Sequence, residues 1–186
     1  MIEVARARAL REGLSSRASF AVGDMRDLES RFEKASFDLV LCLGNTLPHL
    51  AELRPFLAEA GSLLRPGGSL VLQLLNYSRP GTGPGFSFPE AKARGLTMRR
   101  RYESSASAEG ALRFIVELQG AEGSIIEETI LHPIVPSSLA ALLKEAGFRE
   151  TDFRPSWEAA LHPTSQAFDE GRDPYLIAVA RALGET

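Results

Sequence analysis

Two nearly continuous apolar runs, at residues 37–43 and 69–75, constrain the fold of this chain more than any other feature. Such runs are typical of strands that are buried on both faces of a parallel sheet. Residues 51–64 between them have the spacing of an amphipathic helix, and the Arg-Pro-Gly-Gly sequence at 65–68 ends it. Because parallel strands need a crossover, which is usually a right-handed connection through a helix, the pattern predicts an α/β sheet. The helix should bury one stripe, formed by Leu53, Phe56, Leu57, Ala60 and Leu64.

The middle of the chain has a different pattern. Residues 79–89 hold three Pro and three Gly, which predicts a loop. Strands are expected at 96–102, 111–118 and 124–131. The apolar residues Leu112, Phe114, Val116 and Leu118 recur at every second position, which indicates an antiparallel sheet with one solvated face. We therefore expect an antiparallel meander, inserted at about residues 79–133 into a single domain that spans residues 1–186.

Shorter patterns complete the expected order of elements. A helix at 1–14 and a strand at 18–24 precede the first buried run, and a helix is expected at 136–146. Strands at 148–153 and 175–180 end the chain, with a surface loop between them. The first helix lacks a capping residue at its start and should bury Ala7, Leu10 and Leu14, with Ile2, Ala5 and Ala9 extending that face.

Composition excludes several classes of protein. A length of 186 residues suits one domain. Cys42 is the one cysteine, so neither an intramolecular disulfide nor a multi-cysteine zinc site can form. No apolar run approaches the ~18 residues that cross a bilayer, and the N-terminus does not resemble a signal peptide. We expect a cytoplasmic protein without a membrane partner, and the net charge of −3 argues against a nucleic-acid partner.

Common catalytic motifs are absent from the sequence. There is no G-x-S-x-G, His-Glu-x-x-His or C-x-x-C pattern, and the three histidines are far apart, so we expect no metal site. Residues 81–85 superficially resemble a phosphate-binding loop, but a proline interrupts them and no helix follows. In a strand, Arg99 and Arg101 would share one face and Arg100 the other. A solvated sheet face and a site for an acidic substrate both remain open interpretations of this basic run.

Polar or flexible residues follow three of the expected strands. Asp24 with Met25, Gly44 with Asn45, and Asn76 with Tyr77 all come at carboxyl ends. Each pair has an ordinary explanation as a turn or a strand terminator. Because ligands of open α/β sheets bind beyond the carboxyl ends of the strands, the three pairs together favour a shared binding site.

Three segments resemble successive motifs of class I S-adenosylmethionine-dependent methyltransferases. They are residues 20–28, residues 37–50 and the Leu-Arg-Pro-Gly-Gly turn with its following strand at 64–72. Leu43-Gly44-Asn45-Thr46 with His49, and Asn76-Tyr77, resemble the glycine/sarcosine N-methyltransferase branch in particular. The resemblance covers essentially the whole chain and implies a Rossmann-like sheet with S-adenosylmethionine as cofactor.

The resemblance also implies roles for the matching residues. Asp24 would accept a hydrogen bond from the adenine amino group, and the backbone of Met25 would meet the adenine ring. Gly44 and Asn45 would lie near the sulfonium and methionine part of the cofactor, and Leu43 and His49 would also bind the cofactor. Asn76 and Tyr77 would face the substrate. Such enzymes align a nucleophile with the methyl group, so no catalytic side chain is assigned.

The sequence departs from the family pattern in two ways. The glycine-rich strand-loop-helix and the acidic strand end that bind the cofactor have no match, so we expect an N-terminally truncated domain that binds S-adenosylmethionine weakly or not at all. The family places the two unmatched strands between the strand at 18–23 and that at 37–43, so either these two strands close on each other or a second chain, as in a homodimer, covers the edge. A basic residue for a substrate carboxylate is also unmatched near residues 130–136.

Three hypotheses follow from these observations. The first is methyl transfer from S-adenosylmethionine to a nitrogen or oxygen of a small molecule. The second is a non-catalytic, dimerising remnant of a methyltransferase. The third is another nucleotide-binding α/β enzyme, which would bind NAD instead.

Overall fold

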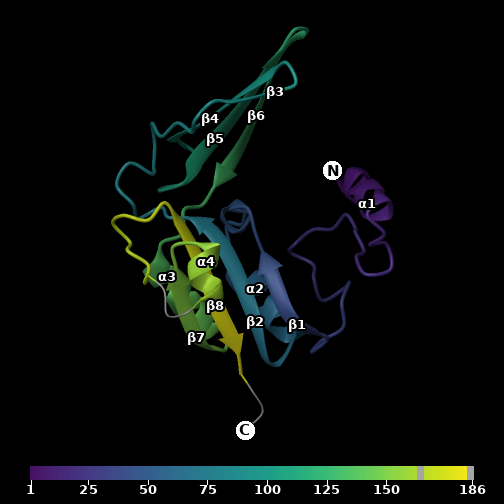
Figure 1. Ribbon diagram of the computed structural model, residues 1–186. Coiled ribbons are helices and arrows are strands. Elements are labelled where there is room, and N and C mark those ends of the chain that lie inside the picture. Colours follow the sequence, from purple (N-terminus) through teal and green to yellow (C-terminus); the bar gives the residue numbers. More distant parts are fainter. Residues whose placement is uncertain (163–165, 184–186) are drawn as a thin grey trace.

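The computed structural model describes residues 1–162 and 166–183. Within them the chain forms two four-stranded sheets, with helices on both faces of the first (Figure 1). The elements run in the order α1 (Ile2–Arg11), β1 (Phe37–Cys42), the 3-10 helix η1 (Leu47–His49), α2 (Arg54–Leu63), β2 (Leu64–Leu75), β3 (Ala91–Ala93), β4 (Leu96–Ser104), β5 (Leu112–Gly120), β6 (Gly123–Leu131), α3 (Pro136–Glu145), β7 (Phe148–Arg154), α4 (Trp157–Leu161) and β8 (Tyr175–Ala182).

The first sheet is mixed and has the order β1-β2-β8-β7. β1 and β2 are parallel, with Val40 opposite Leu70, and α2 is the crossover between them. β8 lies antiparallel between β2 and β7. The α/β sheet and its strand-helix-strand unit are therefore confirmed.

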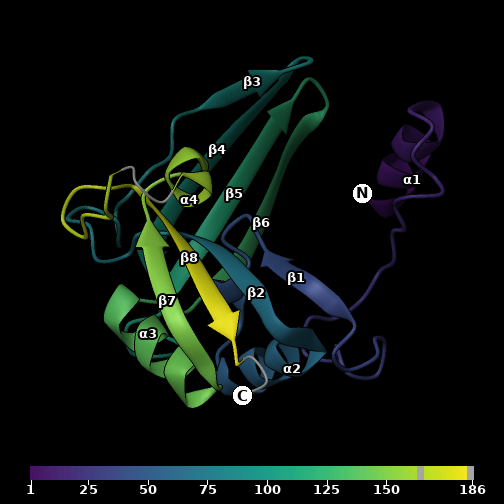
Figure 2. The same ribbon diagram turned by 60° about the horizontal axis from the view of Figure 1, so that its bottom comes forward.

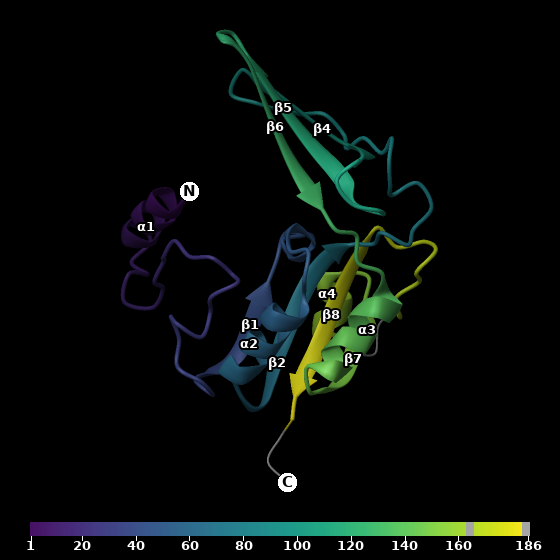
Figure 3. The same ribbon diagram turned by 180° about the vertical axis from the view of Figure 1, so that it is seen from behind.

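The core of the mixed sheet lies under α2 and α3, which cover the same face, while α4 packs on the other face against β7 and β8 (Figure 3). Leu70, Leu72 and Leu74 of β2 meet Leu57 of α2 and Leu139 of α3, and all five are almost completely buried. Each such side chain contributes roughly 1.5–3 kcal/mol by leaving water. The expected stripe of the second helix is confirmed, because Leu53, Phe56, Leu57, Ala60 and Leu64 are all buried.

β1 is an edge strand among the described residues, and one of its faces is bare. Leu39, Leu41 and Leu43 project from that face and are 49%, 50% and 41% exposed. Val40 and Cys42 alternate with them and pack on the core. β1 therefore has the apolar composition of a central strand in the position of an edge strand.

The expected strand at 18–24 is wrong. Residues 18–24 have no strand pairing, and Val22 is 77% exposed. An extended segment becomes a strand only when a neighbour takes up its backbone hydrogen bonds, and the described residues offer none here. Of the two alternatives for the edge of the strand at 37–43, closure by this strand is therefore not what the structure has.

The expected N-terminal helix forms as α1, but its expected buried face is wrong. Leu10 is 72% exposed, Leu14 is 37% exposed, and Ala9 is the only buried residue of the helix. α1 lies away from both sheets (Figure 2). The segment that follows is tied to α2 by Glu59, whose Oε2 accepts hydrogen bonds from the Leu28 and Glu29 amides at 2.7 Å and 3.2 Å.

The antiparallel meander is confirmed, and it has β3 as an additional short strand in the order β3-β4-β5-β6. It projects from the end of the mixed sheet where β1 and β2 finish (Figures 1 and 2). An aromatic cluster joins the two sheets: Tyr102 is fully buried among Phe86, Phe88 and Phe114, with Leu75 and Tyr77 from the end of β2.

The expected surface loop between the last two strands contains a helix, α4. Ser156 caps it by accepting a hydrogen bond from the Ala159 amide at 3.2 Å. A helix this short escapes periodicity analysis, although a Ser directly before Trp-Glu-Ala-Ala is a recognisable capping signal. Within the described residues, no helix has the length and apolar composition needed to cross a membrane.

Candidate functional site

The centre of the candidate site is the turn that follows β1. Gly44 and Asn45 both have left-handed backbone conformations, with φ of 74° and 60°, which glycine and asparagine tolerate better than other residues. Gln73 of β2 holds the turn, because its side-chain Oε1 accepts from the Gly44 amide at 3.0 Å and its carbonyl accepts from the Asn45 amide at 3.1 Å. The Asn45 Oδ1 atom accepts from the Leu75 amide at 2.9 Å. The ends of the two parallel strands are thereby locked together.

Two tyrosines lie behind this turn. The Asn45 Nδ2 atom donates to the Tyr77 hydroxyl at 2.8 Å, and that hydroxyl lies 3.5 Å from the Tyr102 hydroxyl. Burial raises the pKa of both phenols, so both are neutral at physiological pH. They orient the Asn45 amide and supply no charge.

A cavity of about 490 Å³ opens in front of the turn. It lies where the ends of β1 and β2 meet the meander and the start of β8. Its lining includes Gly44, Asn45, Gln73, Phe88, Arg100 and Tyr175. The cavity therefore occupies the position beyond the carboxyl ends of the strands where α/β sheets bind ligands.

A second hollow, of about 590 Å³, lies on the other side of η1. The structure brings Asp24, Met25 and His49 together there. The Asp24 carboxylate is exposed and pairs with the Arg26 guanidinium at 2.6 Å, and these hydrogen bonds lower its pKa to about 2. Asp24 is thus an ionised acceptor beside the half-buried Met25 side chain.

The predicted cofactor residues are thus divided between two hollows. Gly44 and Asn45 line the first, and Asp24, Met25 and His49 line the second, with no lining residue in common. Leu43 lines neither hollow; it is partly exposed, and its carbonyl accepts from the Thr46 hydroxyl at 2.5 Å.

The two predicted substrate residues line neither hollow. Asn76 is completely buried, where its Nδ2 donates to the Glu170 and Asp173 carbonyls at 2.7 Å and 2.8 Å. It ties the end of β2 to the segment before β8. Tyr77 supports Asn45 from behind, as described above.

Sequence reasoning missed most of the lining, including Gln73, Phe88, Glu90 and Tyr175, because these residues come from separate parts of the chain. The sequence indicated Arg100 as part of a basic run. The alternation of side chains along a strand was the signal that could have separated it from Arg99 and Arg101 and placed it on the face of the cavity. Among the residues described, no cluster of three His, Cys, Asp or Glu could hold a metal ion. Cys42 is buried, and burial raises the pKa of its thiol to about 11, so it is not an activated nucleophile.

Comparisons with known proteins find methyltransferases. Residues 1–68 match a family model described as a methyltransferase domain. The structure is similar to the CcbJ methyltransferase from Streptomyces caelestis, with a TM-score of 0.75 and 21% identity over 98% of this chain and 75% of that chain. Residues 1–68 thus match a methyltransferase domain, and the described structure has the fold of class I S-adenosylmethionine-dependent methyltransferases.

Two further methyltransferase structures share the fold. One is an S-adenosylmethionine-dependent methyltransferase from Clostridium acetobutylicum ATCC 824, with a TM-score of 0.73 and 12% identity over 98% of this chain and 71% of that chain. The other is S-adenosylmethionine-bound CalS10, an amino pentose methyltransferase from Micromonospora echinaspora, with a TM-score of 0.60 and 20% identity over 93% of this chain and 70% of that chain. At these identities the likeness concerns the fold.

The hydrogen-bonding groups of the two hollows fit the two ends of S-adenosylmethionine. Adenine presents an amino donor on a flat apolar ring, which suits the ionised Asp24 beside Met25. The methionine end would meet the Gly44–Asn45 turn, where the side-chain amides of Asn45 and Gln73 converge. No carboxylate lines the first cavity except Glu90, on the meander side, so the described residues offer none at the turn for the ribose hydroxyls.

Proposed function

We propose that the chain transfers the methyl group of S-adenosylmethionine directly, in line, to a nitrogen or oxygen of a small molecule. The observation that carries this proposal is the cavity of about 490 Å³ in front of Gly44 and Asn45, which the meander covers. A cavity of this size admits a small acceptor, and small-molecule sites are commonly of several hundred Å³.

Every predicted residue except Asn76 has a role in this proposal. Asp24 and Met25 hold the adenine, with His49 beside them, and Leu43, Gly44 and Asn45 meet the methionine part. Tyr77 acts through Asn45, by fixing the amide that faces the cavity. Assignment to the glycine/sarcosine branch rests on these motifs alone and stays a prediction.

The cofactor supplies an electrophilic methyl group, so the protein has to position and desolvate the acceptor. Phe88, Leu74 and Leu75 give the cavity apolar walls that exclude water. The neutral side chains of Asn45, Gln73 and Tyr175 offer hydrogen-bonding groups to orient the acceptor. No side-chain nucleophile is needed for a direct transfer.

Calorimetric titration with S-adenosylhomocysteine tests this proposal. We expect saturable but weak binding, because the turn offers no carboxylate for the ribose hydroxyls, and each missing charged hydrogen bond costs about 1.5–3 kcal/mol, or roughly 10-fold to 150-fold in affinity. Asn45→Ala should weaken binding further, whereas Ser107→Ala, in a distant exposed turn, should not. Radiolabelled methyl transfer to a panel of amines and phenols then tests the reaction.

Two results would overturn the proposal. The first is no saturation by S-adenosylhomocysteine at millimolar concentration, and the second is tighter binding of NAD under the same conditions. The second result would favour another nucleotide-binding enzyme of the α/β class.

One observation favours a second candidate function, a dimerising methyltransferase-like module. β1 combines an unpaired edge with a bare face of three partly exposed leucines, and such edges pair readily with other strands. Light scattering after size-exclusion chromatography distinguishes the two candidates. A dimer that Leu41→Lys converts to monomer, in a protein that does not bind S-adenosylhomocysteine, supports the module.

A further inference from the structure

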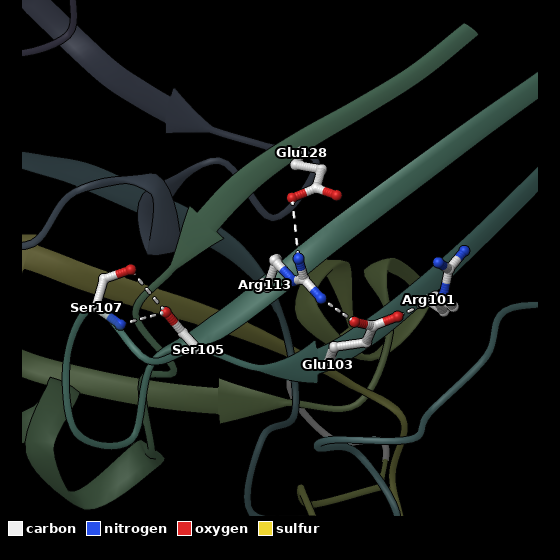
Figure 4. A network of polar contacts seen from close by, with 6 residues as sticks. All are labelled: Arg101, Glu103, Ser105, Ser107, Arg113 and Glu128. Carbon is white, nitrogen blue, oxygen red and sulfur yellow. Dashed lines mark hydrogen bonds and ion pairs between the residues drawn. The ribbon is translucent and has the colours of Figure 1, made fainter.

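Arg100 differs from its two arginine neighbours in the surroundings of its side chain. Arg99 pairs with Glu90 at 2.8 Å, and Arg101 pairs with Glu103 at 2.8 Å. Figure 4 shows the Arg101 side of β4, where Glu103 also meets Arg113, and Arg113 meets Glu128. Arg100 belongs to the opposite face of the strand, and it lines the cavity in front of Asn45.

The Arg100 guanidinium lacks a carboxylate partner within the part of the chain that the structure describes. Its Nε atom is buried without a hydrogen bond, and its guanidinium carbon lies 4.9 Å from the centre of the Phe88 ring. Arg113 also has a buried, unbonded Nε, but its terminal nitrogens pair with Glu103 and Glu128. Arg100 is therefore a partly buried cation without a carboxylate partner among the described residues.

Such an arrangement is costly unless an anion completes it. Stacking on Phe88 offsets part of the cost and holds the planar guanidinium in place. Glu90 also lines the cavity, but Lys92 at 3.1 Å and Arg99 at 2.8 Å already neutralise it. The cavity thus offers one unpaired positive group with a geometry that matches a carboxylate or a phosphate.

We propose that Arg100 binds an anionic group of the methyl acceptor, so that the acceptor is a small molecule with a carboxylate or a phosphate. The inference rests on the proposed function where it identifies the bound anion as part of a methyl acceptor. The anion site itself does not depend on methyl transfer. Arg100 would act as a specificity-determining residue, because a neutral analogue leaves its guanidinium desolvated and unpaired.

Binding of matched probes to the full chain tests this assignment without any methyl transfer. The probes are 4-hydroxybenzoate and its neutral counterpart 4-hydroxybenzamide, with phenyl phosphate as a third, and affinities are measured by NMR titration. We expect the wild-type protein to prefer an anionic probe over the amide by roughly tenfold or more, as a charge-assisted pair provides. A comparison of the affinities for 4-hydroxybenzoate and phenyl phosphate distinguishes a carboxylate site from a phosphate site.

Three variants localise the effect. Arg100→Gln should abolish the preference, and Arg101→Gln, the neighbouring residue on the opposite face, should leave it unchanged. Arg100→Lys keeps the charge but not the planar fork, so it should keep a reduced preference, and it serves as the informative variant if Arg100→Gln lowers the melting temperature.

Each result decides the assignment. No binding of either anion at millimolar concentration, equal binding of acid and amide, or a preference that survives Arg100→Gln would overturn it. S-adenosylhomocysteine could fail to bind while the preference for the anion persists and depends on Arg100. That result would contradict the proposed methyl transfer and support the anion site. If S-adenosylhomocysteine binds but the preference is absent, only the anion site fails.

Discussion

The Asn45 side chain donates to the Tyr77 hydroxyl at 2.8 Å and thereby connects the turn after β1 to the residues that follow β2. The same side chain accepts from the Leu75 amide, so one asparagine uses both ends of its amide to join two strands. The φ of Asn45 is 60°, a left-handed backbone conformation that few residues other than glycine and asparagine adopt readily.

This contact predicts a ranking of substitutions at Asn45. Asn45→Gly removes the amide but accepts the left-handed backbone, whereas Asn45→Ala also adds strain, so we expect Asn45→Ala to be less stable than Asn45→Gly by about 1 kcal/mol. The measurement is the free energy of unfolding in urea. In a cycle with Tyr77→Phe, the coupling energy of Asn45→Gly should be about 0.5–1.5 kcal/mol, and strict additivity would contradict the contact.

The bare face of β1 predicts unequal costs for two leucines. Leu72→Ala removes a fully buried side chain and should cost about 2–5 kcal/mol of unfolding free energy. Leu41→Ala removes a side chain that is 50% exposed and should cost less than about 1.5 kcal/mol. Equal costs in urea unfolding would mean that this face is covered in solution, and dilution of the Leu41→Ala protein would then show whether a second copy covers it.

The Asp24–Arg26 pair predicts a pH dependence with a defined sign. Because the folded-state pKa of Asp24 is lowered to about 2 by Arg26, its stabilising effect is complete above the unfolded value of about 4. The effect is lost as pH falls from about 4 through about 2. Carboxyl-carbon NMR should find this low pKa and should show it rising toward the unfolded value in Arg26→Gln, while Arg17→Gln leaves it in place.

The buried Cys42 thiol predicts slow alkylation of the native protein. With its pKa raised to about 11, the thiolate fraction at pH 8 is more than about a hundredfold below that of a free cysteine, and burial slows the reaction further. Iodoacetamide labelling followed by mass spectrometry should be slow in buffer and fast in denaturant. Similar rates in both would show that β1 opens readily.

The strands that the sequence predicted correctly are those whose partners lie nearby in the chain. Residues 37–43 and 69–75 pair with each other across one helix, so local hydrophobicity was sufficient to find them. Residues 20–23 have a similar local pattern but pair with no strand among the described residues, and they remain irregular. A strand forms only when two segments pair, and the hydrophobic pattern of one segment does not show whether a partner is present.

The part of the candidate site that local sequence could predict is the part that directly follows a predicted strand. Gly44 and Asn45 follow a strand directly, and the rule for strand ends located them. Asn76 satisfied the same rule, yet its amide is used to hold the segment before β8, which no sequence pattern indicated. Phe88 and Tyr175 reach the cavity only through the packing of the two sheets.

The contact between Glu59 and the Leu28 amide has a consequence for how the protein opens. Residues 1–36 touch the main core mainly through Met25 and Leu28, so we expect this segment to open as a separate unit before the mixed sheet unfolds. A ligand that contacts both Asp24 and Asn45 would bridge that unit and the sheet. Ligand occupancy would then be visible as slower amide exchange in the N-terminal segment, far from the atoms that react.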